Sequence, residues 1–172
     1  MLTKNQIDYL STVPEDKIAH VVPFDPAMQT TAQEIISEMK SDLPEAEVFY
    51  IGSSKLGIAG ENDIDMTVMS NGYFLDYMKV MEGRYGRPQH MNQEGKYIKW
   101  EFVRNGFPVE LHLNDVVTPN FQEQINTQKI LESNANLRFE YEQVKLRSNG
   151  LPWREYLTRK YEFWNKILGL GA

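Results

Sequence analysis

The sequence predicts a mixed α+β fold, and three observations carry that prediction. Two strand-like segments flank Asn105-Gly106 and indicate a β-hairpin over residues 96–114. Two short segments rich in β-forming residues, 47–51 and 63–69, are separated by a glycine-containing stretch. After Pro119 the pattern is helical to the end of the chain. Because helices and strands do not alternate regularly, a doubly wound parallel sheet is disfavoured.

Composition is that of a folded protein. The chain has 172 residues, 41% of them hydrophobic and 12% aromatic, which suits one domain, or one domain with an appended helical lobe. It has no cysteine, which excludes disulfides and thiolate metal sites. The first residues lack the apolar core of a signal peptide, and no apolar run approaches the ~20 residues of a membrane span. We therefore expect a cytoplasmic protein without a membrane partner.

The net charge of −6 bears on the class of partner. Binding to a long nucleic-acid tract needs concentrated lysine and arginine, so the acidic balance disfavours such a partner. It does not disfavour a nucleoside triphosphate, because Mg²⁺ held by acidic side chains can supply positive charge locally.

The N-terminal part is expected to form a helix, an extended segment and a second helix. Residues 2–12 predict the first helix, and residues 18–24 read as extended. Asp25 is expected as the N-cap of the second helix, with Pro26 at its first position. Apolar residues then recur at helical spacing to about Ser41.

The middle of the chain predicts a strand over 47–51, a loop over 52–62, a strand over 63–69 and a helix over 73–82. Alternation along the second strand separates two faces. The apolar face carries Ile64, Met66 and Val68, and the polar face carries Asp63, Asp65 and Thr67.

A two-residue type I′ turn at Asn105-Gly106 sets the register of the hairpin. The apolar face then pairs Arg104 with Phe107, Phe102 with Val109, Trp100 with Leu111, and Ile98 with Leu113. The polar face pairs Glu101 with Glu110, and Lys99 with His112. Two glutamates directly opposite each other are unfavourable by up to about 1 kcal/mol. A cation, or Lys99 reaching diagonally, would resolve that repulsion.

The C-terminal part predicts helices over 120–132, 136–148 and 153–168, with a break at Asn149-Gly150. The expected organisation is an α/β core over residues 1–118 and a helical region over 119–172 packed on that core, either as two units or as one single domain.

Asp63 and Asp65 are the strongest candidates for chemistry. They lie on one face of a strand, and a divalent cation would relieve the repulsion between their carboxylates. Gly52-Ser53, just after the preceding strand, would let backbone and a hydroxyl approach phosphate oxygens. Taken alone, an Asp-x-Asp pair more often belongs to a solvent-exposed face of a strand. The pair together with the preceding Gly52-Ser53 turn and the later Glu110, in this order along the chain, favours a metal site. Further candidates for phosphate or substrate contacts are Ser54, Lys55 and His112.

These residues resemble the nucleotidyltransferase superfamily. Its pattern is matched by Ile51-Gly52-Ser53, Asp63-Ile64-Asp65-Met66 and Val109-Glu110-Leu111. A narrower resemblance is to the GrpB family within it, and is spread over residues 18–167. It is carried by the segment His20 to Pro26, by Glu110 to Leu113, and by two Tyr-x-x-x-Lys stretches, Tyr141 to Lys145 and Tyr156 to Lys160.

The resemblance implies a nucleotidyltransferase-type mixed β-sheet with helices packed on one face and a C-terminal helical region. It also implies catalysis at Asp63, Asp65 and Glu110, which would hold Mg²⁺ or Mn²⁺. Gly52, Ser53, Lys145 and Lys160 would contact the triphosphate of a nucleotide. The acceptor hydroxyl stays open between a small molecule, RNA and a protein. Two alternatives also stay open: a catalytically silent nucleotide-binding or partner-binding module, and a phosphohydrolase that uses the same carboxylates.

Overall fold

The computed structural model describes residues 1–92 and 94–170 and is built around a mixed five-stranded sheet. The strands lie in the order β1-β2-β5-β4-β3. Only the β2–β5 pair is parallel among the described strands; the other neighbours are antiparallel. The strand bounds are β1 Glu47–Ile51, β2 Ile64–Met69, β3 His90–Asn92, β4 Tyr97–Arg104 and β5 Phe107–Asn114. The predicted mixed α+β class is thus confirmed.

The hairpin β4–β5 has the register that the turn predicts. Asn105 and Gly106 both have positive φ (53° and 84°), as a type I′ turn requires. All the predicted pairs are present, including Glu101 opposite Glu110 and Trp100 opposite Leu111. The strands' inner face is therefore apolar, and their outer face is polar.

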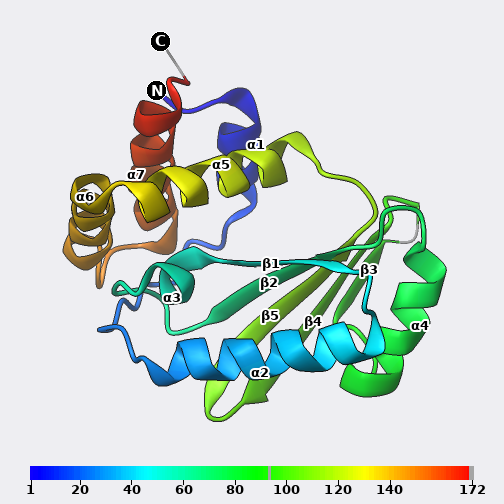
Figure 1. Ribbon diagram of the computed structural model, residues 1–172. Helices are drawn as coiled ribbons and strands as arrows, with labels where there is room; N and C mark the ends of the chain where they lie inside the picture. Colours follow the sequence, from blue (N-terminus) through cyan, green and yellow to red (C-terminus); the bar gives the residue numbers. More distant parts are fainter. Residues whose placement is uncertain (93, 171–172) are drawn as a thin grey trace.

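Two helices cover the apolar face of the sheet, α2 (Ala27–Asp42) and α4 (Phe74–Tyr85) (Figure 1). They bury a core against the inward residues of four strands, β1, β2, β4 and β5. Its members include Ile35, Met39, Phe74, Met81, Ile64, Met66, Trp100 and Leu111. At the start of α2, the Asp25 carboxylate accepts a hydrogen bond from the amide of Ala27 (2.9 Å), while Pro26 lies one position before the helix rather than inside it.

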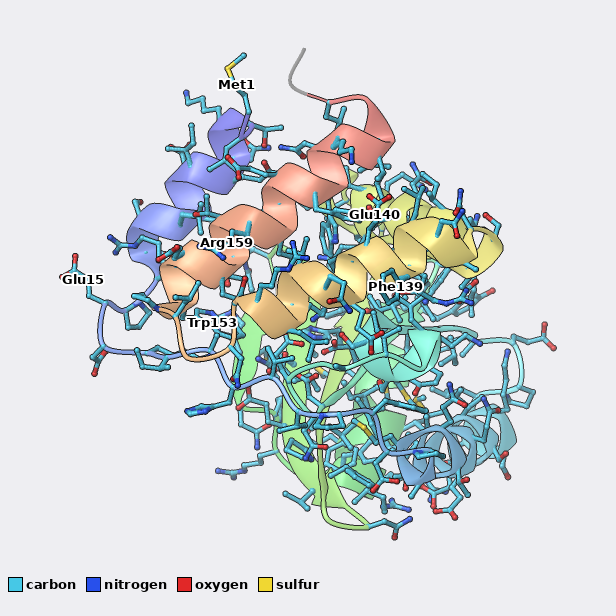
Figure 2. All side chains as sticks on the ribbon, turned by 90° about the vertical axis from the view of Figure 1, so that its left-hand side faces the viewer. Met1, Glu15, Phe139, Glu140, Trp153 and Arg159 are labelled. Carbon is cyan, nitrogen blue, oxygen red and sulfur yellow. The ribbon has the colours of Figure 1, made fainter. Side chains whose placement is uncertain are left out.

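The remaining long helices lie over the opposite, polar face of the sheet (Figure 1). They are α5 (Pro119–Ser133), α6 (Ala135–Arg147), α7 (Trp153–Leu168) and the N-terminal α1 (Lys4–Thr12). Figure 2 shows α1 and α6 on either side of α7. Gln6 and Asn165 join α1 to α7 through two buried side-chain hydrogen bonds of 2.8 and 3.0 Å. No helix in the described ranges is long and apolar enough to cross a membrane.

Two local expectations need correction. Residues 52–62 were expected to be a loop, but they begin with a short helix, α3 (Gly52–Leu56). Strand β3 was not expected; it is a three-residue edge strand whose pairing with β4 is a tertiary effect.

Candidate functional site

Gly52 lies at the junction of β1 and α3 with φ of 88°, a conformation that favours glycine. A Cβ atom there would lie 2.8 Å from Oδ2 of Asp65, so a side chain would displace this carboxylate. The amide of Gly52 donates a hydrogen bond to Oε1 of Gln128 on α5 (3.1 Å). The turn therefore places the backbone of Gly52 directly against Asp65, one of the predicted metal ligands.

Ser53 is buried beside this turn and lines a large cavity. Its position depends on Gly60, which no sequence motif marks as part of the site. A Cβ atom on Gly60 would lie 2.4 Å from Cβ of Ser53 and 2.7 Å from its Oγ. Gly60 also exchanges two backbone hydrogen bonds with Val22, of 2.8 and 3.0 Å. The close approach explains why a glycine stands here, although the sequence alone marked it only as a loop residue.

Ser54 and Lys55 follow on α3 but are not among the residues that line this cavity. Ser54 is buried, and Lys55 places its ammonium 5.7 Å from the centre of the Tyr50 ring. The structure thus gives no support for the phosphate contacts predicted for these two residues.

Asp63, Asp65 and Glu110 come from neighbouring backbone segments and line a cavity of about 770 Å³. The parallel register of β2 and β5 places Asp65 beside Glu110, and Asp63 lies two residues earlier on the same face. Burial raises the pKa of Asp65 well above its ordinary value, and the charges of Asp63 and Glu110 add to this shift. Burial and the nearby Glu61 also raise the pKa of Asp63. Asp63 and Asp65 therefore carry negative charge that the nearby lysines do not fully offset.

Glu110 is the best compensated of the three carboxylates. The His112 imidazole, with Nε2 3.8 Å away, and the Lys99 ammonium, 3.1 Å away, lower the pKa of Glu110 to about 2. Only the lysine is within hydrogen-bond distance. Lys99 also lies 2.5 Å from Glu101, so it resolves the predicted glutamate repulsion. The other ring nitrogen of His112, Nδ1, is 3.0 Å from the hydroxyl of Tyr97.

Lys145 and Lys160, the two predicted triphosphate contacts, both line the cavity but differ in their partners. Lys145 is 1% exposed, and its Nζ lies 2.6 Å from Glu61 Oε2 and 2.6 Å from the Tyr156 hydroxyl. The Tyr156 hydroxyl also contacts the other oxygen of Glu61.

Within the described part of the chain, Lys160 forms no such ion pair, and its Nζ lies 5.1 Å from the Trp164 ring centre. Burial alone would lower the pKa of Lys160, but Tyr141, Glu61 and Asp65 outweigh it and raise the pKa. Lys160 is therefore the cation available to a bound anion, whereas Lys145 is already paired.

The chemistry of the acidic residues suits a divalent cation. Mg²⁺ takes oxygen ligands and is typically held by one or two carboxylates together with phosphate oxygens of the substrate. Asp63 and Asp65 supply two carboxylates whose mutual repulsion such an ion would relieve. Among the described residues, no three or more His, Asp or Glu side chains are grouped closely enough to hold a metal ion on their own. The donor set thus fits an ion shared with substrate.

Comparison with solved structures identifies the fold. GrpB from Enterococcus faecalis superimposes with a TM-score of 0.61 at 15% identity, over 86% of this chain and 99% of that one. The GLD-2/RNP-8 complex gives 0.52 at 13% identity, over 96% of this chain and 63% of that one. A cytoplasmic RNA terminal U-transferase gives 0.50 at 17% identity, over 83% of this chain and 44% of that one.

At these identities the likeness establishes the fold alone, and this chain spans only part of the last two structures. No family model matches the sequence, and no curated protein matches it. The fold predicted from the motifs, a GrpB-like nucleotidyltransferase fold, is confirmed.

Proposed function

We propose that this chain, which has the fold of GrpB and the nucleotidyltransferases, transfers a nucleoside monophosphate from a nucleoside triphosphate to an acceptor hydroxyl with the help of Mg²⁺ or Mn²⁺. One observation supports this most strongly. Asp65 lies beside Gly52, Asp63 and Glu110 at the wall of a large cavity, and the nearby Lys160 compensates its carboxylate charge only in part. Partly buried like charges at a cavity are costly to stability and are concentrated at functional sites.

Each residue has a defined task in this proposal. Asp63 and Asp65 would hold the ion, which when bound would offset the charge of the phosphates and of the developing transition state. Ser53 would donate a hydrogen bond to a phosphate oxygen, and Lys160 would bind the triphosphate by charge. Glu110, ionised because its pKa is about 2, is too weak a base to remove a hydroxyl proton efficiently. Its task is instead to orient the acceptor hydroxyl or to complete the ion site.

Transfer is tested with each nucleoside triphosphate labelled at the α-phosphate, Mg²⁺ or Mn²⁺, and a panel of small-molecule, RNA and protein acceptors. The proposal predicts label on an acceptor. Release of free phosphate without label transfer would identify a phosphohydrolase instead.

The contact between Lys99 and Glu110 favours a second candidate function, a catalytically silent nucleotide-binding or partner-binding module. In such a protein the lysine would keep this carboxylate neutralised permanently. Nucleotide binding without transfer to any acceptor would support this second candidate.

Replacing Lys160 by methionine is expected to weaken binding of a non-hydrolysable nucleoside triphosphate at least tenfold. A charge-assisted hydrogen bond contributes about 1.5–3 kcal/mol, and tenfold corresponds to about 1.4 kcal/mol. Calorimetry in the presence of Mg²⁺ measures the change. Lys166→Met, at an exposed position on the same helix, is the control and should bind as the unmodified protein does. Equal affinity in the two variants would remove Lys160 from the triphosphate site.

Replacing Lys99 by methionine is expected to strengthen Mg²⁺-dependent nucleotide binding about fivefold or more. Without the ammonium, Glu101 and Glu110 repel each other across the hairpin, and a bound cation relieves that repulsion. The dissociation constant is compared across a Mg²⁺ series by calorimetry, with the exposed Lys129→Met as control. An unchanged dependence on Mg²⁺ would show that Lys99 does not compete with the ion.

A further inference from the structure

The cavity continues past the carboxylates along the polar face of three strands. The register of β2, β5 and β4 orders this face into rows. The first row is acidic: Asp65, Glu110 and Glu101. Two residues further along each strand, roughly 7 Å away, the second row holds Thr67, His112 and Lys99. The third row holds Asn114 and Tyr97. All members of the last two rows line the cavity.

We propose that this extension is the acceptor site and that it takes a small, uncharged polyhydroxyl compound, a sugar or a nucleoside. The inference rests on the proposed nucleotidyl transfer and names its acceptor class.

The position of the extension follows from the geometry of the transfer. In phosphoryl-type displacement, the attacking and leaving oxygens lie roughly in line on opposite sides of the phosphorus. The leaving pyrophosphate would face Ser53 on α3, which follows β1 at the edge of the sheet beside β2. The attacking hydroxyl therefore approaches from the other side of Asp65, which is the side of β5 and β4. On that side, β5 and β4 carry four members of the second and third rows: His112, Lys99, Asn114 and Tyr97. Thr67, the fifth member, lies on β2 itself, two residues from Asp65.

The hydrogen-bonding groups of the extension match hydroxyls. Thr67 is 4% exposed and has no side-chain hydrogen bond within the described chain, yet it lines the cavity. The Oδ1 atom of Asn114 is buried without a hydrogen-bond partner. A buried polar atom left unpaired costs about 1–3 kcal/mol, and a rotation of the Asn114 side chain toward the cavity would let a ligand hydroxyl recover it. Hydroxyl and amide groups together both donate and accept, as sugar hydroxyls do.

The charges of the extension disfavour a phosphorylated acceptor. Lys99 is already paired with two glutamates, and Lys96 lies 2.5 Å from Asp115. Among the described residues that line the cavity there is no arginine. No unpaired cation is thus left in the extension to bind a phosphate or a nucleic-acid backbone.

The size of the cavity also favours a small acceptor. Ligand pockets of ~300–1,000 Å³ hold one drug-sized molecule, and the whole cavity here is about 770 Å³. It must contain the nucleotide as well. Asn120 and Gln124 of α5 line the cavity and add further amide groups to its wall.

The test uses the full chain with Mg²⁺ and a saturating non-hydrolysable nucleoside triphosphate, so that the nucleotide site is filled. Ligand-detected NMR titrations compare glucose and uridine with glucose 6-phosphate, uridine 5′-monophosphate and a short oligouridylate. Thr67→Val removes only the cavity hydroxyl. Thr158→Val is the matched control, because the Thr158 hydroxyl bonds to the Arg154 carbonyl on α7, away from the cavity.

We expect glucose or uridine to bind, and to bind about fivefold more weakly to Thr67→Val but not to Thr158→Val, the effect of one lost neutral hydrogen bond. Glucose binding identifies the acceptor as a sugar, and uridine binding identifies it as a nucleoside. Tighter binding of the phosphorylated compounds or of the oligonucleotide would overturn the inference, as would an unchanged affinity in Thr67→Val.

The two proposals fail differently in this design. Label transfer to RNA or protein, with neither glucose nor uridine bound, overturns the acceptor site alone. Thr67-dependent binding of glucose or uridine, with no transfer from any triphosphate, supports the site and overturns the transfer reaction.

Discussion

Asp65→Asn is expected to reduce nucleotidyl transfer by about 10³-fold or more and, at the same time, to raise the melting temperature. Loss of one carboxylate from the ion site removes several kcal/mol of transition-state stabilisation, and each 1.36 kcal/mol is tenfold in rate. Asparagine keeps the shape of the side chain, so the turn at Gly52 is preserved. The rate is measured by label transfer from an α-labelled triphosphate.

The gain in stability has a different physical origin. Burial and the charges of Asp63 and Glu110 raise the pKa of Asp65 in the folded protein above its ordinary value of 3.8. The folded state therefore holds this proton more tightly than the unfolded chain does, and stability falls as the pH rises above about 3.8. Removing the charge should therefore stabilise the fold near neutral pH, which is measured as a rise in melting temperature.

Asp115→Asn is the matched control for this stability effect. Lys96 and Ser70 lower the pKa of Asp115 to about 2, so its charge stabilises the fold and its loss should lower the melting temperature. Thermal unfolding at pH 7 without metal compares the two variants. A fall in melting temperature for Asp65→Asn, or full retention of transfer, would contradict the assignment of Asp65 as an ion ligand whose charge is only partly compensated.

Lys145→Met is expected to cost about 3–5 kcal/mol of unfolding free energy. The substitution leaves Glu61 buried without its closest cation, and breaking a buried ion pair from one side has a cost of this size. Denaturant unfolding measures it. The exposed Lys166→Met is the control and should change stability by less than about 0.5 kcal/mol. Equal effects of the two substitutions would show that the buried pair is not a stabilising contact.

Glu61, the partner of Lys145, provides a second test of the same ion pair. Burial alone would raise its pKa, but Lys145 and Lys160 outweigh burial and lower the pKa of Glu61 to about 2. Its contribution to stability is therefore present above pH 4.5 and is lost as the pH falls toward 2. In Lys145→Met/Glu61→Gln the cost should be smaller than the sum of the single variants, because neither charge is left unpaired.

The features set by local chemistry could be predicted from the sequence. Asn105-Gly106 specifies a turn type, and the turn specifies the register that places Glu110 opposite Glu101. Alternation along β2 separates Asp65 from the apolar side chains of the same strand. The same register left two ways to relieve the glutamate repulsion, a cation or Lys99, and the structure shows Lys99 in contact with both glutamates.

The features set by long-range packing could not be predicted. Glu61 and Lys145 are 84 residues apart in sequence, and no local pattern marks them as partners. Long-range packing also sets two contacts of α3. Gln128 on α5 accepts from the Gly52 amide, and Gly60, in the loop after α3, approaches Ser53 closely. Lys145 and Lys160 look equivalent in the sequence, and only the tertiary structure separates the paired lysine from the unpaired one.

Calorimetric titration of a non-hydrolysable nucleoside triphosphate, with and without Mg²⁺, tests the central claim most directly. If Asp63 and Asp65 hold an ion shared with the nucleotide, the unmodified protein binds much more tightly with Mg²⁺. That gain then disappears in Asp63→Asn and in Asp65→Asn but not in the control Asp115→Asn. Binding that is independent of Mg²⁺, or a gain from Mg²⁺ that survives in both ligand variants, would contradict the claim.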